Sequence, residues 1–81
     1  MKFIKRLPAI DTMLTFETAA RHLSFTRAAI ELNLSQSAVS RQVQQLEKRL
    51  GVQLFIRQHK QIELTHAGQI LMRGVAQSID I

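Results

Sequence analysis

Residues 25–50 read FTRAAIELNLSQSAVSRQVQQLEKRL, and this stretch decides the fold. Two helical patterns lie in it, at about 26–33 and about 36–50. Asn33 and Leu34 separate them as a tight turn, because asparagine tolerates the left-handed backbone that ends a helix when glycine is absent. Two helices joined by such a short turn are typical of a helix-turn-helix.

Each of these two helices has its own start signal and its own apolar face. Either Ser24 or Thr26 can cap the first helix and Ser35 can cap the second, since hydroxyl side chains accept hydrogen bonds from the free N–H groups there. Gly51 is the expected C-terminal stop of the second helix. The apolar residues expected in the core are Ala28 or Ala29 with Leu32, and then Val39, Val43, Leu46 and Leu50.

A further helix is predicted on each side of the pair. An apolar stripe with spacings of three, four and three predicts a helix at about 9–23, and Pro8 stands where a first turn tolerates proline. That stripe consists of Met13, Phe16, Ala20 and Leu23. After the pair, Thr65 caps a last helix whose apolar residues step by four. They are Ala67, Leu71, Val75 and Ile79, with Ile70 and Met72 beside them.

The apolar period changes from helical to alternating between these last two helices. Two short alternating runs predict strands that pair as a β-hairpin. The runs are Val52, Leu54 and Ile56, and then Ile62 and Leu64. A polar and positive turn, residues 57–60, joins them without the Asn-Gly signal of the tightest turns.

These elements together predict a mainly α fold, a winged helix-turn-helix of three helices plus a two-stranded hairpin wing. The domain would cover 8–65, with the helix-turn-helix at 25–44 and the wing at 52–64. Residues 65–81 would form the start of a further helix.

The composition fits one small, folded, basic domain. The 81 residues carry 11 Lys and Arg against 6 Asp and Glu, a formal net charge of +5, with 46% apolar residues and no cysteine. Such a short chain has little core on which to hold a catalytic cleft, so we expect no enzyme. The three histidines lack companions at metal-ligand spacing, and we expect neither metal nor cofactor. No apolar run reaches the roughly 18 residues of a membrane helix. Nucleic acid is the commonest partner of such a domain.

The outer face of the second helix carries groups that can read DNA. In folds of this type that helix enters the major groove, where arginine matches guanine, glutamine matches adenine and serine matches either. No carboxylate occurs between Glu31 and Glu47, and one there would repel phosphates. A merely solvated face is the alternative. The residues opposite the apolar stripe are Gln36, Ser37, Ser40, Arg41, Gln44 and Lys48.

Positive side chains elsewhere would add contacts. The hairpin tip offers Arg57, His59 and Lys60 to phosphate or the minor groove, unless the turn is only a solubilising one. Arg27 could position the domain on the DNA backbone or be a plain surface charge. A protein-interaction module on the same scaffold is the competing function. It should carry exposed Leu, Phe or Tyr anchors on the 36–48 face, where this chain carries Gln, Ser and Arg.

Several motifs resemble, in order, the N-terminal domain of LysR-type transcriptional regulators, from about Pro8 to Gly68. They are the stretches 25–29 (FTRAA), 34–43 (LSQSAVSRQV), 46–47 (LE), 50–51 (LG), 54–57 (LFIR) and 64–68 (LTHAG). The stretch 16–26 resembles the branch that includes regulators of glycine cleavage and of β-lactamase expression.

The resemblance implies a bacterial, sequence-specific regulator that binds double-stranded DNA in the cytoplasm, at the nucleoid. Carried over by position, it implies base or phosphate contacts by residues of the second helix and a wing contact by Arg57. Ser37 stands where many relatives have proline, and it adds a hydroxyl donor. The residues expected at DNA, from both lines of reasoning, are Thr26, Arg27, Ser35, Gln36, Ser37, Ala38, Ser40, Arg41, Gln44, Lys48, Arg57, His59 and Lys60.

The last helix is expected to pair two copies of the chain, as the resemblance also implies. A helix of about 16 residues extends about 24 Å. A core this small should not bury its apolar stripe, so a partner helix would cover it. The expected dimer residues are Ala67, Ile70, Leu71, Val75 and Ile79. The resemblance further implies a higher oligomer for a full-length regulator and an inducer-binding effector domain, which this chain lacks.

Overall fold

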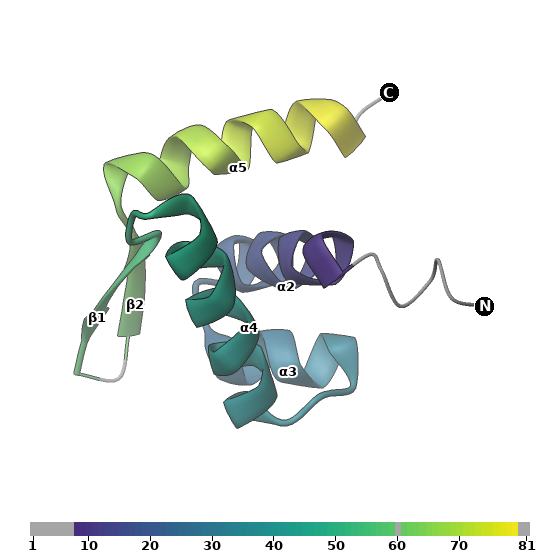
Figure 1. The fold of residues 1–81 in the computed structure, drawn as a ribbon. Helices are drawn as coiled ribbons and strands as arrows, with labels where there is room; N and C mark the ends of the chain where they lie inside the picture. Colours follow the sequence, from purple (N-terminus) through teal and green to yellow (C-terminus); the bar gives the residue numbers. More distant parts are fainter. Residues whose placement is uncertain (1–7, 60, 80–81) are drawn as a thin grey trace.

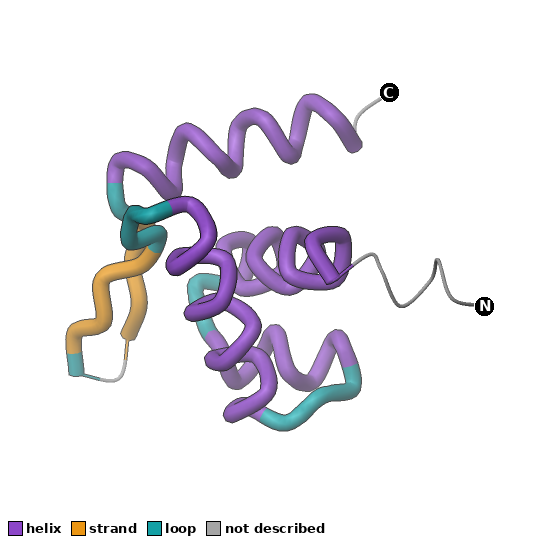
Figure 2. The backbone as a smooth tube through the Cα atoms, in the orientation of Figure 1, coloured by secondary structure: helices purple, strands orange, loops and turns teal. Residues whose placement is uncertain are grey.

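The structure is a computed structural model that describes the backbone of residues 8–59 and 61–79, and side chains within 12–75. Its elements are α2 (Pro8–His22), α3 (Phe25–Leu32), α4 (Gln36–Leu50), β1 (Phe55–Gln58), β2 (Gln61–Leu64) and α5 (His66–Ile79). Helices α2, α3 and α4 pack together, the hairpin stands beside them, and α5 runs across the top (Figures 1 and 2). The predicted winged helix-turn-helix is confirmed.

The core lies where the three helices meet the base of the hairpin. Phe16 of α2 is fully buried, and its ring lies 5.5 Å from that of Phe55 at the start of β1. Phe25 of α3 meets Phe55 edge-on at 5.4 Å. Aromatic pairs favour such tilted and edge-to-face arrangements. Val39 and Val43 of α4 complete this core and are fully buried. The aromatic residues therefore join the wing to the helices.

The predicted caps of the helix-turn-helix are confirmed. Ser24 is the cap of α3, since its Oγ accepts a hydrogen bond from the N–H of Arg27 at 3.0 Å. Ser35 caps α4 in the same way. Asn33 has φ 59° and Gly51 has φ 73°, so both helices end in the left-handed conformation that their residue types favour.

The predicted start and facing of the first strand are wrong. Strand β1 begins only at Phe55, which pairs with Leu64, and Val52 lies exposed in the preceding turn. Phe55 is 4% exposed, whereas Ile56 is 41% exposed. Because side chains alternate along a strand, Phe55 and Arg57 face the helices and Ile56 faces away.

Glu47 explains why the strand starts late. Its Oε2 accepts hydrogen bonds from the N–H groups of Leu54 (2.8 Å) and Phe55 (3.3 Å), and its carbonyl accepts from Gly51 and Val52. These bonds fold the chain into a compact turn. The two consecutive buried residues at 54 and 55 follow from this turn and not from strand alternation.

The predicted burial of the last residue in two apolar stripes is also wrong. Leu23 lies beyond α2 with φ 50°, and its side chain is exposed. Leu50, the last residue of α4, is exposed as well. Leu23 thus follows the end of its helix, and Leu50 stands in the last turn of α4 with its side chain toward solvent. Helix α2 also buries three hydroxyl side chains that its apolar pattern does not indicate, namely Thr12, Thr15 and Thr18.

Helix α5 starts as predicted, but most of its apolar residues face the core of the domain. Thr65 Oγ1 accepts from the N–H of Gly68 at 3.0 Å, which confirms the cap. Ala67 and Leu71 are partly buried against the core and Val75 is 9% exposed, so the domain itself largely covers three of the five residues expected to need a partner. The premise that this small core cannot cover the stripe is therefore wrong for these three. Ile70 is 54% exposed, and the Ile79 side chain lies outside the described residues.

Candidate nucleic-acid interface

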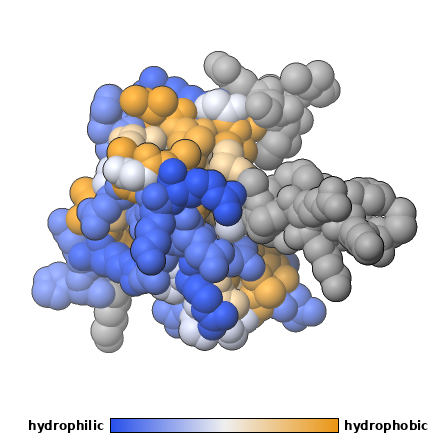
Figure 3. All heavy atoms as spheres, viewed as in Figure 1, coloured by the Kyte–Doolittle hydropathy of each residue, from blue (hydrophilic) through white to orange (hydrophobic). Residues whose placement is uncertain are grey.

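Helix α4 presents a continuous polar face to solvent. Its apolar residues are buried, and the polar side chains on its other side are left exposed. Gln36, Ser37, Arg41, Gln44 and Lys48 are exposed, and Ala38 and Ser40 are half-buried at the margin. Hydrophilic side chains accordingly gather along the front of the molecule over α4, while hydrophobic ones gather over and beside α5 (Figure 3).

Helix α4 is held in place by a polar contact on its inner side. The hydroxyl of Thr15 in α2 donates to the side-chain oxygen of Gln42. Thr15 is buried and Gln42 is half-buried, so this hydrogen bond satisfies two polar groups between α2 and α4. It adds to the burial of Val39, Val43 and Leu46, which determines which residues of α4 face outward. The sequence pattern did not identify this contact, because Gln42 is polar and its partner lies 27 residues earlier.

Two carboxylates lie near the polar face of α4, and they differ in where they point. The carboxylate of Glu47 is bound to the backbone of the turn before β1. Glu63, which the sequence reasoning overlooked, is exposed on β2 opposite Ile56. Strand alternation puts it on the outward side of the hairpin, away from Arg57. Glu63 therefore lies away from the side between α4 and the hairpin, whereas Glu47 lines a pocket there together with Gln44 and Arg57.

The start of α3 reaches the same side of the molecule. Thr26, exposed in the first turn of this helix, lines a pocket with Gln36 and Arg57. Arg27, also exposed, lines a different pocket with His22, Ile30 and Glu31. The Ser35 hydroxyl accepts from the N–H of Ala38 at 3.1 Å and lies 3.2 Å from the Ser37 hydroxyl. Ser35 therefore caps α4, and its exposed hydroxyl can still donate a hydrogen bond to a further acceptor.

An exposed ion-pair cluster fixes α3 on α2, which the sequence reasoning also overlooked. Arg21 binds Glu17 at 3.0 Å and Glu31 at 2.7 Å, and His22 Nε2 lies 2.7 Å from Glu31. The hydrogen bond from Arg21 is the main cause that lowers the pKa of Glu31 to about 2, with a second contribution from His22. The same contacts raise the pKa of Arg21.

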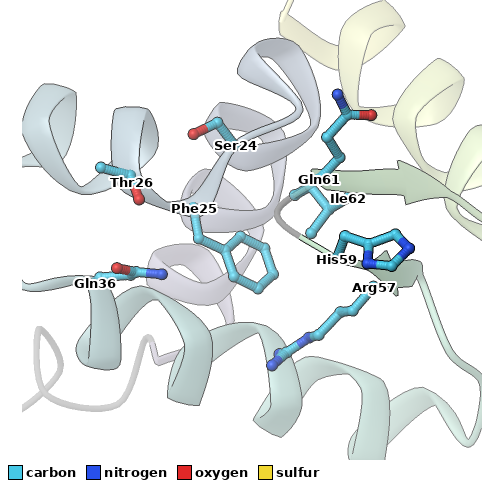
Figure 4. Close-up of a pocket in the computed structure, with 8 residues that line it drawn as sticks. All are labelled: Ser24, Phe25, Thr26, Gln36, Arg57, His59, Gln61 and Ile62. Carbon is cyan, nitrogen blue, oxygen red and sulfur yellow. The ribbon is translucent and has the colours of Figure 1, made fainter.

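Arg57 makes two contacts within the protein. Its Nη2 donates to Ser40 Oγ at 3.1 Å. Its guanidinium carbon lies 5.0 Å from the centroid of the Phe25 ring, within the range of a cation–π contact. Figure 4 shows the side chain reaching from β1 past the ring toward α4. Sequence reasoning placed Arg57 in the wing but could not identify these partners.

The hairpin tip is a two-residue turn. Gln58 pairs with Gln61, so only His59 and Lys60 lie between the strands. His59 is exposed with φ 52°, a left-handed conformation uncommon for a residue with a side chain. Lys60, expected to touch DNA, lies outside the described residues.

An open pocket with both polar and apolar lining residues lies where these elements meet. It has a volume of about 510 Å³. Its lining residues come from the starts of α3 and α4, from β1 with the tip of the hairpin, and from β2 (Figure 4). They are Ser24, Phe25, Thr26, Gln36, Arg57, His59, Gln61 and Ile62. The structure thus brings Arg57 and His59, two of the predicted wing residues, to one groove with Gln36 at the start of α4.

Two other kinds of site were sought among the described residues. No group of three or more His, Asp or Glu side chains in that part of the chain could hold a metal ion. None of the described helices is long and apolar enough to cross a membrane.

A family model and the curated relatives of this chain both point to one protein family. The family model of the "Bacterial regulatory helix-turn-helix protein, lysR family" matches residues 10–69. The transcriptional regulator DsdC of Escherichia coli K12 is 52% identical over 71 residues, which are 88% of this chain and 23% of that protein. The glycine cleavage system transcriptional activator of the same organism is 52% identical over 65 residues, 80% of this chain and 21% of that protein. The chain thus spans less than a quarter of the length of these two relatives.

Solved structures agree with this result. The DNA-binding domain of CbnR in complex with DNA superposes with a TM-score of 0.80 at 34% identity, covering 86% of this chain and 80% of that one. The DNA-binding domain of BenM with the catB site 1 DNA gives a TM-score of 0.81 at 30% identity, covering 86% and 78%. The expected resemblance to regulators of glycine cleavage is confirmed as well. With most of its length matched by the family model, the chain belongs to the LysR family of bacterial helix-turn-helix regulatory proteins.

Proposed function

We propose that this chain is the DNA-binding part of a bacterial transcription regulator and that it binds double-stranded DNA sequence-specifically. The exposed face of α4 carries amide, hydroxyl and guanidinium groups, and the one carboxylate of this helix, that of Glu47, is bound to backbone N–H groups; this is the observation that supports the proposal most strongly. Similar domains of CbnR and BenM have been solved with DNA. The relatives are named as transcriptional regulators, so we infer a binding function and not an enzymatic one. The protein would act in the cytoplasm, on the nucleoid.

In this proposal α4 lies in the major groove and the hairpin tip lies on the backbone or in the minor groove. The side chains best suited to base edges are Gln36, Arg41 and Gln44. A glutamine amide can make two hydrogen bonds to adenine, and an arginine guanidinium can make two to guanine. Ser37, Ala38 and Ser40 would contact bases or phosphates beside them, and Lys48 would contact phosphate. At one edge of the interface, the backbone of one DNA strand would be contacted by Thr26, Arg27 and Ser35. At the other edge, the backbone of the second DNA strand would be contacted by His59 and Lys60.

Gel-shift titrations at several salt concentrations test this function. Phosphate contacts release counterions, so affinity should fall steeply with salt for any duplex. An enriched duplex should bind more tightly than random DNA at physiological salt. Equal affinity for the two duplexes would contradict sequence-specific binding. Tight binding to an acidic protein with none to DNA would favour the competing interaction module.

We further infer that two copies pair through α5, on the side that carries Ile70, one of the expected dimer residues. Ile70 remains exposed, whereas Ala67, Leu71 and Val75 pack inward. In sedimentation velocity, Ile70→Glu should shift the chain toward monomer, while Gln69→Glu, one residue earlier, should do so less. Equal effects of the two variants would contradict this face. Higher oligomers and an inducer belong, in this proposal, to a longer regulator.

A further inference from the structure

We propose that Arg57 is a positioning residue that holds the wing and α4 in one fixed arrangement, and that it acts on DNA recognition through Ser40. This inference rests on the proposed function and deepens it. It differs from the expectation that Arg57 is itself the wing's DNA contact. Its basis is the position of one guanidinium between two elements of the interface.

Strand alternation first brings Arg57 to this position. Arg57 lies two residues after Phe55, so both side chains are on the side of β1 that faces the helices. Phe55 is buried against Phe25, which leaves the Phe25 ring beside Arg57. Arg57 lines the groove between α4 and the hairpin, where its guanidinium is engaged by Phe25 and Ser40, whereas His59 stands at the tip of the hairpin.

The two partners of Arg57 then fix its direction. The ring of Phe25 supports the guanidinium at 5.0 Å, and Nη2 reaches Ser40 Oγ at 3.1 Å. Ser40 lies on the same helix as Arg41, at the margin of the polar face. A planar guanidinium can stack on a ring and donate in its own plane at the same time, which an ammonium group cannot do. The contact therefore requires arginine in particular.

This contact has a consequence for the chemistry of Ser40. Arginine only donates hydrogen bonds, so the Ser40 oxygen must accept from Arg57 and its own proton is left to donate. Ser40 would thus offer a donor, toward a DNA acceptor such as purine N7, thymine O4 or a phosphate oxygen. Without Arg57 the hydroxyl is free to rotate and to accept instead. Arg57 would in this way set the hydrogen-bonding character of a recognition residue.

Substitutions at Arg57, measured by the salt dependence of binding, separate positioning from direct contact. A lost phosphate contact lowers the slope of log K against log salt by about 0.9. A lost positioning contact leaves the slope unchanged and reduces the preference for the enriched over the random duplex, by roughly tenfold for one charge-assisted bond. We expect this second result for both Arg57→Gln and Arg57→Lys. Arg49→Gln, which removes the same charge at the end of α4, should leave the preference unchanged.

Ser40→Ala tests whether Arg57 affects DNA recognition by way of its hydrogen bond to Ser40. If Arg57 acts through Ser40, the double variant of Arg57→Gln with Ser40→Ala should lose no more preference than the worse single variant. Additive losses would overturn the proposal. So would full rescue by Arg57→Lys, or a slope reduced by about one charge in Arg57→Gln.

A measurement without DNA distinguishes this inference from the proposed function. In NMR spectra of the free protein, the Arg57 side-chain protons should be shifted upfield by the Phe25 ring, and Phe25→Leu should remove the shift. Absence of a shift in the wild type would overturn the positioning contact even if DNA binding is specific. A wild type with the shift but with no preference among duplexes would refute the proposed function and, with it, the role of Arg57 in recognition.

Discussion

Replacing Glu47 with alanine should unfold the protein more easily and weaken DNA binding, although it removes a negative charge beside the interface. The carboxylate accepts hydrogen bonds from the N–H groups of Leu54 and Phe55, whose side chains are buried. Alanine offers no acceptor to these groups. The turn that sets the start of β1, and hence the facing of the hairpin, would lose its anchor.

The structure gives the scale of the effect. A hydrogen bond to a charged group contributes about 1.5–3 kcal/mol, and the bond to Phe55 is long at 3.3 Å. We therefore expect the free energy of unfolding to fall by about 2–4 kcal/mol. In a domain of this size that lowers Tm by roughly 10–25 °C. Glu47→Gln keeps one oxygen acceptor and should lose about half as much.

Thermal and urea unfolding, followed by circular dichroism, measure these changes. Glu63→Ala is the matched control, because it removes the same charge from an exposed position on β2. It should change stability by less than about 0.5 kcal/mol and should strengthen DNA binding slightly. The reasoning fails if Glu47→Ala and Glu63→Ala destabilise the protein equally, or if Glu47→Ala binds DNA more tightly than the wild type.

Further outcomes concern DNA contacts, pH and packing. Arg41→Ala should weaken binding to the preferred duplex by about 1–3 kcal/mol and relax its specificity, whereas Lys60→Ala should weaken binding to all duplexes alike; competition gel shifts measure both. Because the pKa of Glu31 is lowered to about 2 from 4.5, its contribution to stability is present above pH 4.5 and is lost as the pH falls toward 2. Glu31→Gln should therefore flatten that part of a stability profile, and an unchanged profile would contradict the ion-pair cluster. Gly68→Ala should cost about 1–3 kcal/mol in urea unfolding, since the new Cβ would lie 2.3 Å from the carbonyl oxygen of Leu54. Gly74→Ala, where a Cβ meets nothing within 4 Å, should instead stabilise α5 by about 0.5–1 kcal/mol, and equal effects of the two would refute this packing.

Local signals in the sequence were enough to predict the helix-turn-helix. Ser24, Ser35, Asn33 and Gly51 act on neighbouring backbone groups, so their residue types alone indicate where α3 and α4 begin and end. The polar face of α4 follows from its 3.6-residue period, since the apolar side must be buried. The exposure of Arg41 and Gln44 was therefore predictable.

Contacts between distant residues were not predictable from the same signals. The facing of β1 depends on a hydrogen bond from Phe55 to Glu47, eight residues earlier, so alternation alone put Ile56 on the wrong side. Arg57 finds Ser40 across 17 residues, which no local spacing encodes. The inward turn of Leu71 depends on α5 packing against α2 and β2. Each of these is a tertiary interaction between elements that were individually well predicted.

Selection of bound duplexes from a random pool, repeated with the wild type and with Arg41→Ala, tests most directly whether the face of α4 reads DNA. The wild type should enrich one half-site, and a dimer should enrich it twice at a spacing of about one helical turn or a multiple of it. Arg41→Ala should lose the preference at one base position and keep it at the others. If the wild type enriches no sequence, or if Arg41→Ala enriches the same sequence with undiminished preference, α4 is not the recognition helix.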